Sequence, residues 1–233
     1  KEEFLESNKS FYVALKFGLK DYSIYHNLAS NHFRIGSFLK AKQYFKKSLK
    51  INSKNQIAKH LLNALSGINT KSAPSEYISE LFDNYSKSFE EDLLFKLEYK
   101  MPQQIRKLII NKNTKSIGSV LDLGCGTGLV GLEIGKNCDY LEGIDLSAFM
   151  INESEKKNIY NKLIKTDIID YLTQKILNFD LFIAADVLVY IGELSKVFRE
   201  IKKRNKKSGK FIFTTEHKDG KNFKLEKSGR FSH

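Results

Sequence analysis

The residues most able to do chemistry form a short glycine-rich stretch, Leu121-Asp122-Leu123-Gly124-Cys125-Gly126-Thr127-Gly128. It follows an apolar run and precedes the apolar-periodic residues 129–134, which predicts a buried strand, a tight turn and the start of a helix. Glycines in such a turn adopt open dihedral angles and let a ligand approach the backbone closely. The stretch therefore indicates a site for a nucleotide-type cofactor.

The glycines permit two registers. Residues 126–131 satisfy the dinucleotide pattern G-x-G-x-x-G, and Asp145 follows at about the distance of a ribose-binding acid. In that register Asp122 and Gly124 would lie inside the strand, where a buried carboxylate and a glycine are both unfavourable. A turn that starts at Gly124 instead puts Asp122 at the carboxyl end of the strand. We favour this second register, with an NAD(P)-dependent oxidoreductase as the alternative.

Acidic residues recur at the ends of later apolar runs. Residues 140–145, 163–167 and 179–186 each predict a strand that ends in an acid, and successive acids from Asp122 onward are 23, 22 and 19 residues apart. This spacing suits repeated strand-helix units that build a parallel sheet, and ligands of such sheets bind outside the carboxyl ends of the strands. A fifth strand is expected at residues 210–215. We expect one crevice to be lined by Asp122, Asp145, Asp167 and Asp186.

In the second register the turn resembles motif I of the class I methyltransferases, an acid followed by G-x-G-x-G. This resemblance implies a Rossmann-like α/β fold with a parallel sheet, and S-adenosylmethionine as the cofactor. That cofactor carries an ammonium and a sulfonium but no phosphate, so carboxylates suit it. By resemblance, Asp145 would accept hydrogen bonds from the ribose hydroxyls, Thr166 and Asp167 would flank the adenine, and residues 184–186 would line the methionine and methyl end. Helix capping is the alternative role of Asp167 or Asp186.

Residues 81–102 carry a second resemblance. The stretch L-F-D-N-Y-S-K-S-F-E-E-D-L, followed by L-E-Y-K-M-P, is similar to the lid segment of bacterial methyltransferases fused to tetratricopeptide repeats. Residues 60–65 and 185–192 also match that family. The lid implies that Tyr85 and Phe89 cover the cofactor, while Ser147 would cap the next helix and Met150 would pack beside the adenine. The implied cofactor-binding residues are Tyr85, Phe89, Asp122, Gly124, Cys125, Gly126, Thr127, Gly128, Asp145, Leu146, Met150, Thr166, Asp167, Ala184, Ala185 and Asp186.

The amino-terminal third predicts a helical region. Residues 22–55 fit the 34-residue tetratricopeptide pattern at Tyr25, Leu28, Ala29, Ala41 and Phe45, with Gly36 at the turn between two helices. Residues 1–21 resemble the second helix of an earlier repeat, and residues 56–67 predict a further helix. About three repeats are needed for stability, so we expect either more repeats before Lys1 or packing against the catalytic domain. Such a region is either a groove for a peptide or protein partner or a structural cap.

Three segments follow from these patterns. They are a tetratricopeptide-like region (1–70), a helical linker and lid (71–115) and a methyltransferase domain (116–233) that we expect to be truncated after its fifth strand. The family ordinarily continues beyond that point, and Phe211 and Phe213 are therefore expected on an exposed apolar edge.

The composition limits the classes of partner. The net charge is +12, but 34 of the 39 basic residues are lysines spread along the chain, whereas arginine is preferred for bidentate contacts to nucleic acid. A nucleic-acid acceptor is therefore disfavoured against a small molecule or a protein. The chain has no apolar run of membrane length and no leader pattern, so a cytoplasmic protein is expected. Two cysteines and five scattered histidines support neither disulfides nor a metal site. No catalytic base is assigned, and a noncatalytic scaffold that keeps the cofactor fold is a further alternative.

Overall fold

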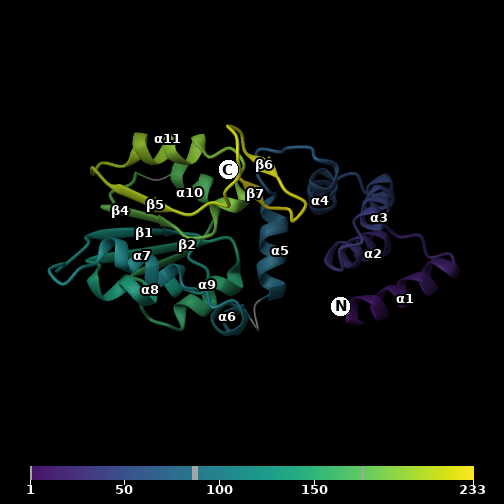
Figure 1. Ribbon diagram of the computed structural model, residues 1–233, viewed down its shortest axis with the longest axis horizontal. Helices are drawn as coiled ribbons and strands as arrows, with labels where there is room; N and C mark the ends of the chain where they lie inside the picture. Colours follow the sequence, from purple (N-terminus) through teal and green to yellow (C-terminus); the bar gives the residue numbers. More distant parts are fainter. Residues whose placement is uncertain (1, 86–88, 175) are drawn as a thin grey trace. The chain divides into compact units, whose positions relative to one another are not determined.

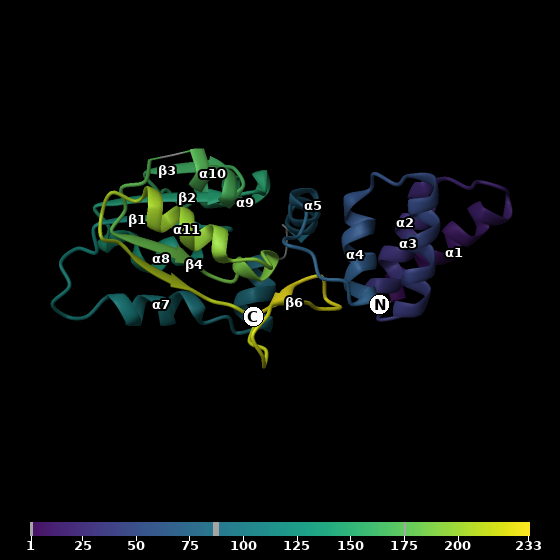
Figure 2. The ribbon, with the colours of Figure 1, turned by 90° about the horizontal axis from the view of Figure 1, so that it is seen from above.

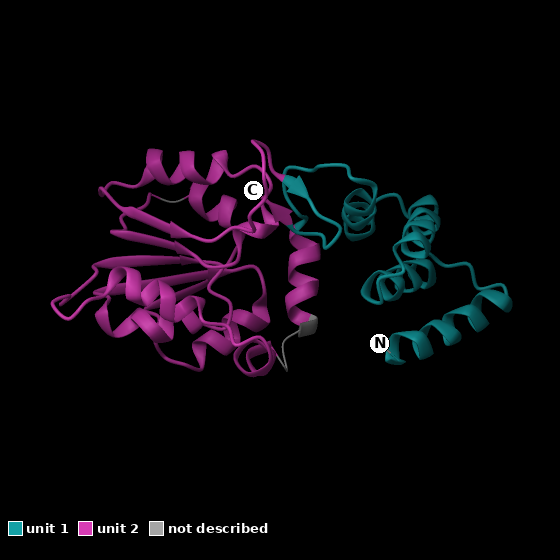
Figure 3. Ribbon diagram, viewed as in Figure 1, with its two compact units in different colours: residues 1–74, 224–230 teal, residues 75–223, 231–233 magenta. Residues whose placement is uncertain are grey.

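The computed structural model describes residues 2–85, 89–174 and 176–233 (Figure 1). The chain forms two compact units, which are coloured separately in Figure 3. Unit 1 comprises Lys1–Pro74 and Lys224–Arg230, and unit 2 comprises Ser75–Phe223 and Phe231–His233.

Unit 1 is helical, as the sequence predicts. Its helices are α1 (Glu2–Lys16), α2 (Tyr22–Arg34), α3 (Phe38–Ile51) and α4 (Gln56–Ser66), and each packs against the next along the chain. The capping residues explain where the helices begin and end: Asp21 and Asn55 accept N–H groups of the first turns of α2 and α4, and Gly67 ends α4 with a φ of 68°. Gly36, with a φ of 82°, lies in the turn between α2 and α3. The buried side chains include Leu28, Ala29, Ala41 and Phe45, four of the five positions at which the sequence fits the repeat pattern.

Residues 224–230 belong to the same unit as these helices, although the sequence places them with the carboxyl-terminal segment. The short strand β6 (Lys224–Leu225) begins this stretch. The N–H of Leu225 donates to Asn69 Oδ1 at 2.8 Å, and the side chain of Leu225 is 1% exposed. His60 Nε2 lies 2.9 Å from the carbonyl oxygen of Gly229. These contacts tie the late segment to the region around α4.

Unit 2 is built on a parallel sheet with the strand order β3-β2-β1-β4-β5. The strands are β1 (Ser119–Leu123), β2 (Tyr140–Asp145), β3 (Lys162–Lys165), β4 (Leu181–Ala184) and β5 (Lys210–Phe213). In the register of the sheet, Asp122 lies opposite Gly143 on β2 and Ile183 on β4. The carboxyl ends of the three central strands therefore meet at one edge, which confirms the predicted α/β architecture. The short strand β7 (Phe231–Ser232) lies outside this sheet.

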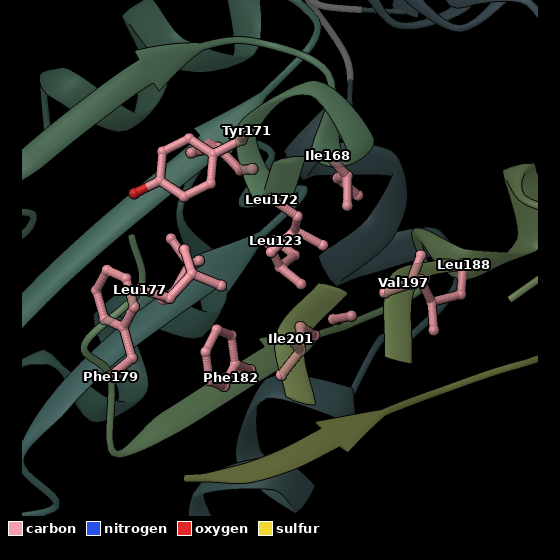
Figure 4. Packing of buried hydrophobic residues seen from close by; sticks show 13 residues of the cluster. Leu123, Ile168, Tyr171, Leu172, Leu177, Phe179, Phe182, Leu188, Val197 and Ile201 are labelled. Carbon is pink, nitrogen blue, oxygen red and sulfur yellow. The ribbon is translucent and has the colours of Figure 1, made fainter. Parts of the chain in front are cut away.

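Helices cover both faces of the sheet (Figures 1 and 2). One face packs on α10 (Ile168–Gln174) and α11 (Ser195–Arg204), and the other packs on α7 (Met101–Ile109) and α8 (Leu129–Ile134). Figure 4 shows the first of these cores, in which Leu123, Phe182 and Leu172 interdigitate. The remaining elements of unit 2 are α5 (Ser75–Tyr85), α6 (Phe89–Glu91), the π-helical turn η1 (Asp92–Lys96), η2 (Gly135–Asn137), α9 (Ala148–Glu155) and η3 (Leu188–Tyr190).

Strand β5 is the edge of the sheet and pairs only with β4 among the described residues. Phe213 is 41% exposed there, as expected. Phe211 is partly buried because its ring packs against Phe198 of α11 and Phe182 of β4, which corrects the expectation that it is exposed. Within the described ranges, every helix is too short or too polar to span a lipid bilayer.

Candidate functional site

The glycine-rich stretch forms the predicted turn between β1 and α8. Gly124, Gly126 and Gly128 have φ angles of 70°, 54° and 89°, a region of backbone conformation that residues other than glycine rarely adopt. The N–H groups of Gly124 and Cys125 both donate to the carbonyl oxygen of Ile144, at 2.8 and 2.9 Å. The turn is therefore anchored to the end of β2, and the buried side chain of Cys125 lies beneath it.

The three glycines differ in the space around them. A Cβ atom on Gly124 would lie 2.4 Å from Val187 Cγ2, and one on Gly128 would lie 2.7 Å from Ser154 Oγ. A Cβ atom on Gly126 would have no atom within 4 Å. Gly126 thus borders open space, and a ligand can approach the backbone of the turn there.

This difference predicts a large loss of stability for one alanine variant and a small loss for another. Gly124→Ala should unfold much of the protein at 37 °C, because overpacking typically costs about 1–3 kcal/mol in addition to the cost of the left-handed conformation, roughly 1–2 kcal/mol. Gly126→Ala should lose only the roughly 1–2 kcal/mol cost of the left-handed conformation from its free energy of unfolding and should stay folded. Its methyl group would occupy space at the turn. Urea denaturation compares the two variants, and equal stabilities would contradict the packing described here.

Asp122 is the most deeply buried acid at this edge. It is 1% exposed, and its Oδ2 accepts a hydrogen bond from the hydroxyl of Tyr160 at 2.7 Å. Its Oδ1 is buried and has no hydrogen-bond partner among the described residues. The pKa of Asp122 is raised to about 7, chiefly by burial and in smaller part by the nearby charge of Asp145, against the lowering effect of the hydrogen bond from Tyr160. A buried carboxylate with a free oxygen needs either a proton or a cationic partner, and a cofactor with a cationic, phosphate-free end fits it.

Asp145 joins the glycine turn to the helix after β2. Its Oδ2 accepts the N–H of Gly126 at 3.0 Å, and its Oδ1 accepts the N–H of Ser147 at 2.8 Å. Burial raises the pKa of Asp145 despite these two hydrogen bonds. Ser147 caps α9 as predicted, because its Oγ accepts the N–H of Met150 at 3.1 Å. Leu146 lies between them, and Met150 is buried.

The end of β3 carries the next two predicted residues. The N–H of Thr166 donates to the carbonyl oxygen of Asp145 at 2.9 Å, so the loop after β3 lies beside the loop after β2. Asp167 Oδ1 accepts the N–H groups of Ile169 at 2.7 Å and Asp170 at 3.2 Å. This is a helix cap for α10, one of the two roles that the sequence leaves open for Asp167.

Asp186 follows β4 and is held by two hydroxyl groups. Tyr99 donates to its Oδ2 at 2.6 Å, and Thr214 donates to its Oδ1 at 2.7 Å. Thr214 Oγ1 also accepts the backbone N–H of Asp186 at 2.7 Å. Asp186 is exposed and has a φ of 55°, so it does not cap a helix. The preceding Ala184 is buried and Ala185 is half-buried.

Residues 75–85 and 89–99 contact the loops that follow several of these strands. Ser147 Oγ donates to Asp83 of α5 at 2.5 Å. Lys157 pairs with Glu90 of α6 and also donates to the carbonyl oxygen of Thr127 at 2.7 Å. Three more contacts of this segment are those of Ser79 with the Leu146 carbonyl, Phe89 with Phe82, and Phe82 with Tyr190. The side chain of Tyr85 lies outside the described part of the structure.

The sequence of this unit agrees with its architecture. Residues 114–229 match a family whose model is described as a methyltransferase domain. This chain contains a class I S-adenosylmethionine-dependent methyltransferase domain.

Solved structures share the fold of the methyltransferase domain. A DhpI-SAM-HEP complex is 16% identical, with 65% of this chain and 69% of that chain covered at a TM-score of 0.52. The N-methyltransferase NodS from Bradyrhizobium japonicum WM9, in complex with S-adenosyl-L-homocysteine, is 20% identical, with 60% and 74% covered at a TM-score of 0.50. The uncharacterized protein MJ1252 of Methanocaldococcus jannaschii is 32% identical over 137 residues, or 59% of this chain and 51% of that protein. The chain thus spans about half the length of this relative.

Four side chains at the edge of the methyltransferase domain were not assigned from the sequence. Tyr99 lies within the predicted lid pattern, which indicated that residues 81–102 lie near the cofactor but assigned no role to Tyr99 itself. Tyr160, Thr214 and Lys157 carry no pattern of their own and reach the site only through the fold. Within the described residues no group of three or more His, Cys, Asp or Glu side chains could hold a metal ion, and Cys125 and Cys138 are free thiols.

Proposed function

We propose that this protein transfers a methyl group from S-adenosylmethionine to a small-molecule or protein acceptor. The observation that carries the proposal is the open space at Gly126, in the turn of a methyltransferase domain that follows the buried Asp122 and donates a backbone N–H to Asp145. Asp122 offers to a cationic group a buried oxygen that no described residue hydrogen-bonds. The pyrophosphate of a dinucleotide would instead meet two carboxylates, which disfavours the oxidoreductase alternative.

The other contacts support a placement of the cofactor along the edge of the sheet. We propose that Asp145 accepts the ribose hydroxyls, since its two oxygens keep lone pairs beyond the two backbone N–H groups that they accept. Thr166, Asp167, Leu146 and Met150 would border the adenine. The methionine and methyl end would then lie near Ala184, Ala185 and Asp186, with Phe89 over the cofactor.

The residues of the chain would act mainly by binding and alignment. When bound, the cofactor supplies an electrophilic methyl group on a sulfonium. Alignment of the two reactants can supply roughly 7–11 kcal/mol of barrier reduction. The contacts from residues 75–85 and 89–99 to the loops after β1, β2 and β4 favour a role in excluding water. A proton acceptor is needed only if the methyl acceptor must lose a proton.

We further propose that the helices of unit 1 form a tetratricopeptide-like surface for a peptide or protein partner. The support is the match of residues 22–55 to the repeat pattern and the burial of Leu28, Ala29, Ala41 and Phe45. A structural cap remains the alternative. A pull-down with the wild-type protein should recover one partner, and that partner should be lost when exposed residues of unit 1 are substituted; a structural cap would recover none.

A ligand comparison tests the cofactor. S-adenosylhomocysteine should raise the melting temperature of the protein, whereas NAD and NADP at equal concentration should not, because binding to the folded state alone stabilises it. A shift with NAD or NADP alone would reject the proposal in favour of an oxidoreductase. Radiolabelled S-adenosylmethionine with a lysate, fractionated into small molecules, proteins and nucleic acids, then identifies the class of acceptor. Cofactor binding without transfer to any fraction would favour a noncatalytic scaffold.

A further inference from the structure

The carboxylate of Asp186 is fixed more firmly than its exposure suggests. An exposed aspartate usually samples several rotamers, but here each carboxylate oxygen accepts one hydroxyl, from Tyr99 at 2.6 Å and from Thr214 at 2.7 Å. These partners come from residues 87 positions before and 28 positions after Asp186. The fold thus brings two distant segments together to orient one carboxylate.

The topology places this carboxylate beside the glycine turn. The strand order changes direction between β1 and β4, and ligands of open parallel sheets bind in the crevice at such a switch point. Asp122 lies on β1 and Asp186 directly follows β4, one on each side of the switch point. Val187, the next residue, packs so closely on the turn that a Cβ on Gly124 would clash with it.

The backbone on both sides of the Tyr99–Asp186 hydrogen bond is unusual. Among the described residues, three non-glycine residues have a positive φ: Glu98, Asn158 and Asp186. Glu98 immediately precedes Tyr99, so two of the three bracket this hydrogen bond. Backbone conformations of this kind persist where the surrounding structure enforces them, and they are common at functional sites.

The Tyr99 hydroxyl remains a hydrogen-bond donor. Burial raises the pKa of Tyr99 well above its ordinary value, and the negative charges of Asp186 and Asp122 raise it further. A neutral phenol that donates to Asp186 orients the carboxylate without cancelling its charge. The remaining lone pairs of Asp186 can therefore face a cation.

We propose that Asp186, oriented by Tyr99 and Thr214, is the counter-charge that distinguishes the sulfonium of S-adenosylmethionine from the neutral sulfur of S-adenosylhomocysteine. This inference rests on the proposed function, in which the adenosine lies toward β2 and β3 and the reacting end lies toward β4. Two cations on the cofactor then face two carboxylates, Asp122 and Asp186. In the transfer a lone pair of the acceptor would form the new bond to the methyl carbon while the electron pair of the broken C–S bond stays on sulfur, so the sulfur of the product is neutral and this interaction is lost.

Calorimetry with three ligands tests the inference without an acceptor. S-adenosylmethionine and sinefungin both carry a positive charge at or beside the reacting atom, whereas S-adenosylhomocysteine does not. Asp186→Asn keeps the shape and tolerates a positive φ, and it should weaken binding of the two charged ligands about tenfold while S-adenosylhomocysteine changes less than twofold. Tyr99→Phe should lose part of the same discrimination, about threefold by the same reasoning, with S-adenosylhomocysteine again unchanged.

The control is Asp170→Asn, an exposed aspartate in the first turn of α10, which should leave all three affinities unchanged. Equal losses for all three ligands, or no loss for any, would overturn the role of Asp186 while the proposed function stands. Failure of the wild-type protein to bind any of the three ligands would instead overturn the proposed function, and this inference with it.

Discussion

Replacing Asp145 with alanine is expected to weaken binding of S-adenosylhomocysteine at least tenfold. In the ligand-free protein this carboxylate accepts the N–H groups of Gly126 and Ser147. Under the proposed function it also accepts the ribose hydroxyls, and hydrogen bonds to charged groups contribute about 1.5–3 kcal/mol each. Even one lost bond of that size corresponds to a tenfold change in affinity. Isothermal titration calorimetry of the variant and the wild type measures the difference.

The stability of the same variant gives a second readout. Asp145→Ala leaves the Gly126 N–H without its acceptor, so the free energy of unfolding of the variant should be lower by about 1–3 kcal/mol. Urea denaturation should therefore show a lower midpoint concentration. Asp170→Asn serves as the matched control and should change neither quantity. An Asp145→Ala protein with wild-type affinity would reject the assignment of the ribose site.

The ligand-free protein is expected to lose stability as the pH rises from about 4 to about 7, because of Asp122. Burial raises the pKa of this carboxyl to about 7 from an ordinary value of 3.8. Between these values the folded state holds a proton that the unfolded chain has released, so the free energy of unfolding falls with rising pH. The full cost is reached above pH 7 and amounts to at most about 4 kcal/mol, at 1.36 kcal/mol per pKa unit.

The variant Asp122→Asn isolates this contribution. Its amide cannot ionise, so urea denaturation should find it close to the wild type at pH 4 and more stable than the wild type at pH 8. Parallel stability curves for the two proteins would show that Asp122 is ionised when folded or has a partner. A cationic ligand beside Asp122 favours the ionised form, so affinity for S-adenosylhomocysteine should fall below pH 7 in the wild type only.

The sequence predicts the sheet well because each strand carries its own signal. The strands β1, β2, β3 and β4 are apolar runs that each end within two residues of an acid, and the helix α8 matches its predicted range 129–134. The fourth strand is shorter than the predicted 179–186, because Asp180 is engaged by Ser119 and Lys207 before the ladder begins. The π-helical turn Asp92–Lys96 has no counterpart in the pattern, since its apolar spacing is that of an ordinary helix.

The site is only partly visible in the sequence, because its contacts differ in range. The glycine turn and its acid are contiguous, so their chemistry can be inferred from one stretch of eight residues. The hydrogen bond of Tyr160 to Asp122 spans 38 positions, and that of Tyr99 to Asp186 spans 87. Nothing in the residue pattern pairs such positions, and only the packing of the loops brings them together.

Unit 1 is discontinuous, and this affects the order in which the protein can fold during its synthesis. Residues 1–74 leave the ribosome before residues 75–223, and the stretch that contains the buried Leu225 follows only after both. At roughly 5–20 residues per second this interval is about 7–30 s. The surface that later buries Leu225 is exposed to solvent during this interval. We therefore expect the nascent helices to be accessible to chaperones until the methyltransferase domain has been synthesised.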